Sequence, residues 1–249
     1  MLAVRGLTKS FGATPAVVGV DVDVEAGESV GLVGPNGAGK TTVLNCIFGQ
    51  LRPDAGSVEL DGRDIGRLPT WRRARLGVAR TYQRLEIFPE LTVRDHLIVA
   101  LRVHRGGTRL WRDLLGMSAP GREEIAAADS VLVALGLLEL ADVPVAALGL
   151  GVCRLVELAR AVVAQPRLLL ADEPTSGLDE QETRDLAGLL RSLQRARGMG
   201  MLLIEHDLAI VEAVVDRVVV MDLGRVVASG SFDEVMAAPA VRRAYLGVP

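Results

Sequence analysis

The sequence lacks any apolar run long enough to cross a membrane. Although 49% of its 249 residues are hydrophobic, the longest apolar stretches have the length of strands or belong to periodic helices, short of the roughly 18 residues that a membrane-spanning helix needs. The N-terminal segment also lacks the pattern of a secretory signal peptide, because Arg5 and Lys9 fall within an extended stretch. We therefore expect a protein of the cytosol.

The sequence also contains few cysteines and lysines, and its net charge is small. Cys46 and Cys153 fall in segments with helical patterns, and we expect both to be reduced core residues rather than a disulfide or a metal-binding pair. The formal net charge of −3 argues against a large nucleic-acid-binding surface, so no nucleic-acid partner is expected. Lysine occurs only at positions 9 and 40, which makes Lys40 conspicuous in the motif described next.

A glycine-rich loop, G-P-N-G-A-G-K-T-T, occupies residues 34–42. It follows an apolar segment of strand character at 30–33 and precedes a helix-like segment at 42–49. It fits G-x-x-x-x-G-K-[ST], the loop whose backbone N–H groups cradle nucleotide phosphates, and the following helix N-terminus adds its dipole. The residues predicted to bind nucleotide here are Gly34, Pro35, Asn36, Gly37, Ala38, Gly39, Lys40, Thr41 and Thr42.

A second motif, L-L-L-A-D-E-P-T-S-G-L-D, lies at 168–179 and ends an apolar strand in two carboxylates. Thr41 and Asp172 supply the hard oxygen donors that Mg²⁺ prefers. Lys40 is a point charge on a long stem that can reach the β- and γ-phosphates. Glu173, one residue past Asp172, can face the γ-phosphate and polarise a water molecule. The two motifs together predict that the chain binds MgATP or a close relative.

The remaining patterns predict an α/β fold. Valines at 18, 20, 22 and 24 alternate with acidic residues, which is typical of a half-buried antiparallel strand, and the segment 2–11 is the expected partner strand. From residue 30 onward, apolar strands alternate with helices, which indicates a parallel sheet. Core strands are expected at 29–33, 167–172 and 201–205, a hairpin at 217–222 and 226–229, and a helix after the Ser231–Glu234 capping box.

Strand signals are scarce between residues 85 and 164. The segments 96–104, 122–135 and 150–164 have helical patterns, whereas glycines and Pro120 break the pattern at 106–121. We interpret this stretch as a helical lobe inserted into the α/β lobe, with a mobile excursion in its middle.

Over nearly the whole chain, these motifs and their order resemble the ATP-binding subunits of ABC transporters. The resemblance implies a P-loop NTPase with a mixed, mainly parallel sheet, an N-terminal antiparallel β-subdomain and an inserted α-helical subdomain. It implies one ATP-binding domain at 1–249, with a RecA-like and β lobe at 1–84 and 165–249 and a helical signature lobe at 85–164.

The same resemblance assigns roles to single residues. Phe11 stands where the family places an aromatic residue that stacks on adenine. Gln83, in R-T-Y-Q, matches the Q-loop glutamine, which would serve catalysis and bind the metal. Asp172 and Glu173 match the Walker B aspartate and the catalytic glutamate. Residues 176–179 match the D-loop, whose Asp179 would lie at the nucleotide, and His206 in I-E-H-D matches the switch histidine. It also ends an apolar strand, where open α/β sheets carry their active groups.

The family's signature, L-S-G-G-Q, reads Leu148-Gly149-Leu150-Gly151-Val152 here. In the family this loop faces the γ-phosphate of the nucleotide held by a partner subunit, so Leu148, Gly149 and Gly151 are predicted nucleotide contacts. Gly149 removes the serine hydroxyl, while the helix N-terminus and the Gly151 N–H remain. We expect anion recognition that is weakened and not abolished.

The tracts at 80–83, 85–93, 154–162 and 244–247 resemble the branched-chain amino acid type of importer, a group that includes urea and short-amide importers. The resemblance implies an ATPase on the cytoplasmic face of the membrane. Its partners would be a second ATP-binding subunit, identical or paralogous, two membrane-spanning permeases and, indirectly, a solute-binding protein. The alternatives are the ATPase of an exporter, such as a lipopolysaccharide exporter, or a non-transport ABC protein acting on DNA or ribosomes. The solute itself stays open.

Overall fold

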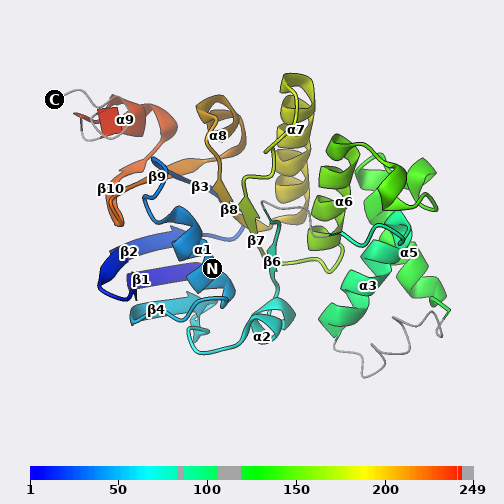
Figure 1. Ribbon diagram of the computed structural model, residues 1–249, viewed down its shortest axis with the longest axis horizontal. Coiled ribbons are helices and arrows are strands. Elements are labelled where there is room, and N and C mark those ends of the chain that lie inside the picture. Colours follow the sequence, from blue (N-terminus) through cyan, green and yellow to red (C-terminus); the bar gives the residue numbers. More distant parts are fainter. Residues whose placement is uncertain (83–86, 106–118, 240, 243–249) are drawn as a thin grey trace.

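The computed structural model describes residues 1–82, 87–105, 119–239 and 241–242. Figure 1 shows two sheets at one end of the molecule and the helices α3, α5 and α6 gathered at the other, with α7 between them. The expected mobile excursion at 106–121 lies largely outside the described residues. Among the helices of the described ranges, none is both long and apolar enough to cross a bilayer.

The N-terminal sheet is antiparallel, as predicted, with strand order β2-β1-β4-β5. Its strands are β1 (Leu2–Phe11), β2 (Thr14–Val24), β4 (Ala55–Leu60) and β5 (Arg63–Asp64). The prediction that Val18 shares the buried face of β2 with Val20, Val22 and Val24 is wrong. Val20, Val22 and Val24 are buried, but the register with β1 shifts between Val17 and Val20, where Gly19 has a φ of 63°. This bulge turns Val17 inward in place of Val18, because one extra residue inverts the side-chain alternation.

The second sheet is mixed and mainly parallel, which confirms the predicted fold class. Its strand order is β10-β9-β3-β8-β7-β6, and only β10 is antiparallel to its neighbour. The strands are β3 (Ser29–Val33), β6 (Val78–Arg80), β7 (Leu168–Asp172), β8 (Gly200–Ile204), β9 (Arg217–Asp222) and β10 (Arg225–Gly230). Every residue of β3, β7 and β8 is buried, as expected for strands covered on both faces.

Helices occupy the three segments predicted between 85 and 164, and within the described part of that stretch only an isolated bridge joins Thr92 to Pro144. The α-helices are α1 (Lys40–Phe48), α2 (Thr70–Arg75), α3 (Val93–Arg105), α5 (Arg122–Ala134), α6 (Leu150–Val162), α7 (Glu180–Arg197), α8 (Leu208–Val214) and α9 (Phe232–Ala237), and two 3₁₀ turns lie at Leu138–Leu140 and Val145–Ala147. The Ser231–Glu234 capping box forms as predicted and begins α9.

Two hydrophobic clusters lie on opposite faces of the mixed sheet. On β7, Leu168 and Leu170 join the cluster that contains α1 and the N-terminal sheet, whereas Leu169 and Ala171 join the cluster formed with α6, α7 and α8. Alternate residues of one strand thus pack into two different hydrophobic cores. Cys46 lies in the first cluster and Cys153 in the second, and both are buried and free. The predicted core position of both cysteines is confirmed.

Candidate functional site

The glycine-rich loop joins the end of β3 to the start of α1 at the carboxyl edge of the sheet. Gly34, Gly37 and Gly39 have φ values of 147°, 82° and 98°. A Cβ at Gly34 would lie 2.1 Å from the carbonyl oxygen of Met221, and one at Gly39 would lie 2.5 Å from that of Ala16. Glycine is therefore required at 34 and 39 by both conformation and space. The loop thus leads directly into the N-terminus of α1, where the first N–H groups of a helix have no acceptor within the helix.

One cavity of about 200 Å³ collects several of the predicted residues. Its lining consists of Ala16, Asn36, Gly37, Ala38, Gly39, Lys40, Thr41, Thr42, Glu173 and His206. The structure thus brings the loop, the residue that follows β7 and the residue beyond β8 to one place. This gathering is what a phosphate-binding and hydrolytic site requires.

Lys40 is buried beneath its own loop. Its Nζ donates hydrogen bonds to the carbonyl oxygens of Gly34 at 2.7 Å and Pro35 at 3.0 Å. Burial lowers the pKa of Lys40, and the charges of Glu173 and Asp172 oppose that shift. The ammonium is held within the loop by weak neutral acceptors. A phosphate would offer it stronger, charged acceptors.

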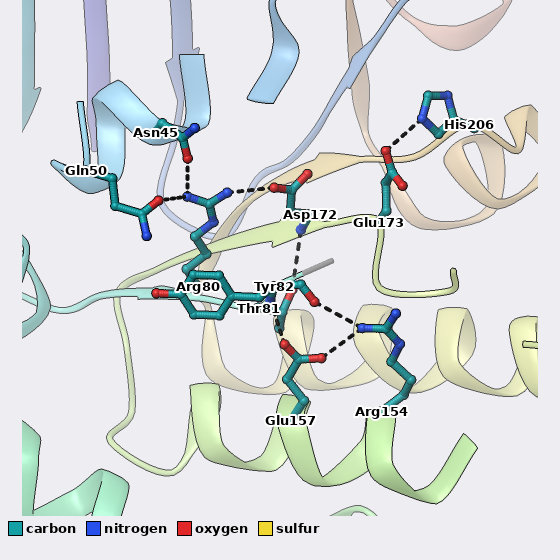
Figure 2. A network of polar contacts seen from close by, with 10 residues as sticks. All are labelled: Asn45, Gln50, Arg80, Thr81, Tyr82, Arg154, Glu157, Asp172, Glu173 and His206. Atoms are coloured by element: carbon teal, nitrogen blue, oxygen red, sulfur yellow. Dashed lines mark hydrogen bonds and ion pairs between the residues drawn. The ribbon is translucent and has the colours of Figure 1, made fainter. Parts of the chain in front are cut away.

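Asp172 is the last residue of β7 and is 3% exposed. Its Oδ2 accepts a hydrogen bond from Arg80 Nη2 at 2.7 Å, and its N–H donates to Thr81 Oγ1 at 3.3 Å (Figure 2). The described residues contain no group of three or more His, Cys, Asp or Glu side chains that could hold a metal alone. The available donors are instead the carboxylate of Asp172 and the hydroxyl of Thr41. They fit a Mg²⁺ that takes its other ligands from phosphate and water.

Glu173 and His206 face each other across the cavity. His206 Nε2 lies 2.7 Å from Glu173 Oε1, as Figure 2 shows. Glu173 has a φ of 47°, a left-handed conformation that costs on the order of 1–3 kcal/mol for a residue with a side chain. Its N–H donates to the carbonyl oxygen of Ile204 on β8 at 2.9 Å, which holds the strained backbone in place. Strain of this kind is concentrated at functional sites, and here it directs a carboxylate toward a histidine.

Phe11 is not among the residues that line this cavity. Phe11, at the end of β1, is 51% exposed, with Lys9 Nζ 6.0 Å from its ring centroid. An exposed ring is available for stacking, so the adenine contact stays a prediction. Gln83 lies outside the described residues, and its proposed roles stay predictions too.

The signature residues lie at the start of α6 and outside the lining of the phosphate-loop cavity. Gly149 is the N-cap residue of α6, with φ −69° and ψ 164°, and no side-chain cap satisfies the helix. A Cβ at Gly149 would meet nothing within 4 Å, whereas one at Gly151 would lie 2.4 Å from Glu182 Oε1 on α7. A side chain at position 151 would therefore displace the carboxylate of Glu182, a contact within this chain that the sequence patterns do not predict.

Asp179 caps α7. Its Oδ1 accepts the N–H of Glu182 at 2.8 Å, and Glu182 Oε2 accepts the N–H of Asp179 at 3.2 Å. This capping box gives Asp179 a structural function within its own subunit. Its predicted place at a nucleotide is additional to that function and stays a prediction.

A buried ion pair on α6 was not predicted. Arg154 Nη1 lies 3.0 Å from Glu157 Oε2, and both side chains are less than one-tenth exposed. Together they bind both backbone groups of Tyr82: Glu157 Oε1 accepts its N–H at 2.6 Å, and Arg154 donates to its carbonyl oxygen at 3.0 Å (Figure 2). Arg154 Nη2 also donates to the carbonyl oxygen of Ser176 at 3.1 Å. Burial raises the pKa of Glu157. The sequence signal that could have indicated this pair is the presence of two opposite charges, Arg154 and Glu157, within the apolar face of a predicted helix.

Comparison with known proteins agrees with this geometry. Residues 17–176 match the family described as ABC transporter. The chain is 40% identical over 250 residues to the high-affinity branched-chain amino acid transport ATP-binding protein LivG of Salmonella typhimurium, with 99% of this chain and 98% of that protein covered. It is 39% identical, with the same coverage, to BraF of Pseudomonas aeruginosa, which has the same description.

Solved structures give the same result. The ADP conformation of MJ1267, an ATP-binding cassette of an ABC transporter, superposes with a TM-score of 0.88 at 30% identity and covers 100% of this chain and 99% of its own. A nucleotide-free ATP-binding cassette from an ABC transporter superposes with the same TM-score, identity and coverage. The chain belongs to the ABC transporter family, and its fold is that of the family's ATP-binding cassettes.

Proposed function

We propose that this chain is the ATP-binding and ATP-hydrolysing subunit of an importer for branched-chain amino acids or a related small polar solute such as urea or a short amide. The observation that supports hydrolysis is the single cavity shared by the glycine-rich loop, Glu173 and His206. The solute class is supported by the names of relatives that align over the whole chain.

The nucleotide would lie along residues 34–42, with Lys40 at the β- and γ-phosphates and Phe11 against the base. Thr41, Asp172 and Gln83 would hold Mg²⁺, which neutralises charge on the phosphates when bound. Leu148, Gly149, Gly151 and Asp179 would contact the nucleotide of a second ATP-binding subunit. That arrangement explains why the signature residues are absent from the cavity of their own chain.

In this proposal Glu173 is the group that polarises the attacking water. Its carboxylate accepts the hydrogen bond of that water, and His206 Nε2, 2.7 Å from Oε1, fixes the orientation of the carboxylate. The strained backbone at Glu173 keeps the carboxylate in the cavity, so little reorganisation is needed when the nucleotide arrives.

The proposed assembly contains a second ATP-binding subunit and two membrane-spanning permeases. A solute-binding protein would be an indirect partner of this chain. The chain would be peripheral to the membrane on its cytoplasmic face. Within the chain, we retain one domain at 1–249 with a RecA-like and β lobe at 1–84 and 165–249 and a helical lobe at 85–164.

A transport assay tests the solute class. The chain would be deleted in its host and uptake of labelled leucine, urea and acetamide measured, with complementation by wild type and by Glu173→Gln. We expect one of these uptakes to fall and to be restored by wild type alone. Unchanged uptake of all three solutes would contradict the importer assignment while leaving the ATPase assignment intact.

A further inference from the structure

Arg80, the last residue of β6, is buried against Asp172. Its side chain and that of Asp172 are 4% and 5% exposed, and Nη2 lies 2.7 Å from Oδ2. The parallel register of β6 and β7 sets Arg80 opposite Leu170, two residues before Asp172. A buried charge pair of this kind is costly to desolvate, so it is weak evidence for a purely stabilising role.

The other side of the guanidinium is anchored to α1 and to Gln50, two residues after the end of α1. Arg80 Nη1 donates to Asn45 Oδ1 at 2.6 Å and to Gln50 Oε1 at 2.7 Å (Figure 2). The rings of Phe48 and Tyr82 lie near the guanidinium, with centroids 5.8 Å and 5.2 Å from Cζ. The planar fork therefore has a fixed position, because hydrogen bonds and ring contacts hold it from several directions.

This anchoring connects two of the proposed oxygen donors of the metal, Thr41 and Asp172. Asn45 lies four residues after Thr41 on α1, and residues four apart lie on the same face of a helix. Arg80 thus joins the helix that carries Thr41 to the carboxylate of Asp172. Arg80 contacts one oxygen of Asp172, Oδ2, and in Figure 2 the other oxygen points away from Arg80.

We propose that Arg80 is a positioning residue for the Mg²⁺ that accompanies the nucleotide: it holds one carboxylate oxygen of Asp172 and leaves the other for the metal. The inference rests on the proposed MgATP site. Residues that orient metal ligands by hydrogen bonds commonly change metal affinity by about 10–100-fold when they are replaced. Arginine is suited to this position because its fork reaches α1 and Asp172 together, whereas lysine supplies the charge at a single point.

The test is the Mg²⁺ dependence of nucleotide binding. Binding of a fluorescent ATP analogue would be measured in EDTA and during a Mg²⁺ titration, without any turnover. Arg80→Lys keeps the positive charge beside Asp172, so affinity in EDTA should be retained. The Mg²⁺ concentration that produces half of the Mg²⁺-dependent increase in nucleotide affinity should rise about 10–100-fold.

Arg73→Lys is the matched control. Arg73 is also buried and also holds α1, through the carbonyl oxygens of Cys46 at 2.6 Å and Ile47 at 2.7 Å. Its replacement should lower the melting temperature and leave the Mg²⁺ dependence unchanged. Should Arg80→Lys not fold, the double variant Asn45→Ala/Gln50→Met removes the anchors of Nη1 and should shift the Mg²⁺ dependence in the same direction.

The outcomes separate the two proposals. A wild-type protein that fails to bind the nucleotide in any condition contradicts the proposed function. Nucleotide binding with a wild-type Mg²⁺ dependence in Arg80→Lys overturns the positioning role. An equal shift in Arg80→Lys and Arg73→Lys would also overturn it, because loosening of α1 would then account for the effect.

Discussion

Gly149→Ser restores the hydroxyl that the family signature carries. From the structure, we expect this substitution to have two effects that can be measured separately. Position 149 is the N-cap of α6 with an extended backbone, and a Cβ there meets no atom within 4 Å. A serine can therefore enter without strain. Its oxygen can accept an N–H of the first helical turn while its O–H donates to a phosphate, since a hydroxyl is both donor and acceptor.

The magnitudes of the two effects differ. Serine in place of glycine at an N-cap is worth a few tenths of a kcal/mol, which for a chain of this size raises the melting temperature by about 1 °C. A hydrogen bond to a charged phosphate is worth about 1.5–3 kcal/mol. At about 1.4 kcal/mol per factor of ten, it should tighten the ATP-bound assembly at least tenfold per signature loop.

The assay is sedimentation of the ATP-bound assembly in a Glu173→Gln background, with calorimetry of the nucleotide-free chain. Gly149→Asp is the control, because aspartate caps a helix as well as serine does but repels a phosphate. We expect both variants to raise the melting temperature, Gly149→Ser to tighten the assembly and Gly149→Asp to weaken it. If both variants change the assembly alike, the start of α6 does not face a phosphate.

Three further predictions follow from single contacts. Lys40→Ala should weaken nucleotide binding by about 10–100-fold, the worth of a charge-assisted hydrogen bond, measured with a fluorescent ATP analogue; unchanged affinity would contradict its role. Gly151→Val should abolish ATP turnover but leave binding to the glycine-rich loop of the same chain intact, and the reason now includes displacement of Glu182, whose Oε1 lies 2.4 Å from the added Cβ; normal turnover would contradict this. Hydrogen bonds from Arg102 lower the pKa of Glu124 from 4.5 to about 2, so this pair should stabilise the fold above about pH 4.5 and cease to do so as the pH falls toward 2. Urea unfolding should therefore separate wild type from Arg102→Met more at pH 7 than at pH 3, and an equal separation would refute the linkage.

The sequence predicted the elements whose burial is uniform. β3, β7 and β8 are short apolar runs covered on both faces, so composition alone marks them. The glycine-rich loop and the residues at the strand ends were predicted because their chemistry requires fixed spacing. The cavity that joins Lys40, Glu173 and His206 confirms that these segments meet.

Other features depend on tertiary contacts that local patterns do not contain. β5 has two residues and both are exposed, and β6 has three, so neither gives a periodic signal. α7 was not predicted although its buried Leu186, Leu190 and Leu193 follow a helical spacing and the Asp179–Glu182 capping box begins it. The bulge at Gly19 and the contact of Arg80 with Asp172 arise from pairing between strands, which the sequence of one strand does not specify.

Glu173→Gln tests the central claim, that Glu173 polarises the attacking water in a complete nucleotide site. The substitution keeps the shape of the side chain and removes its charge. MgATP binding should persist, while phosphate release should fall by roughly 10²–10⁴-fold, about 3–5 kcal/mol of transition-state stabilisation. The measurement is steady-state phosphate release alongside fluorescent-nucleotide affinity on the same preparation. Binding without turnover is the predicted result; turnover near the wild-type rate would contradict the account.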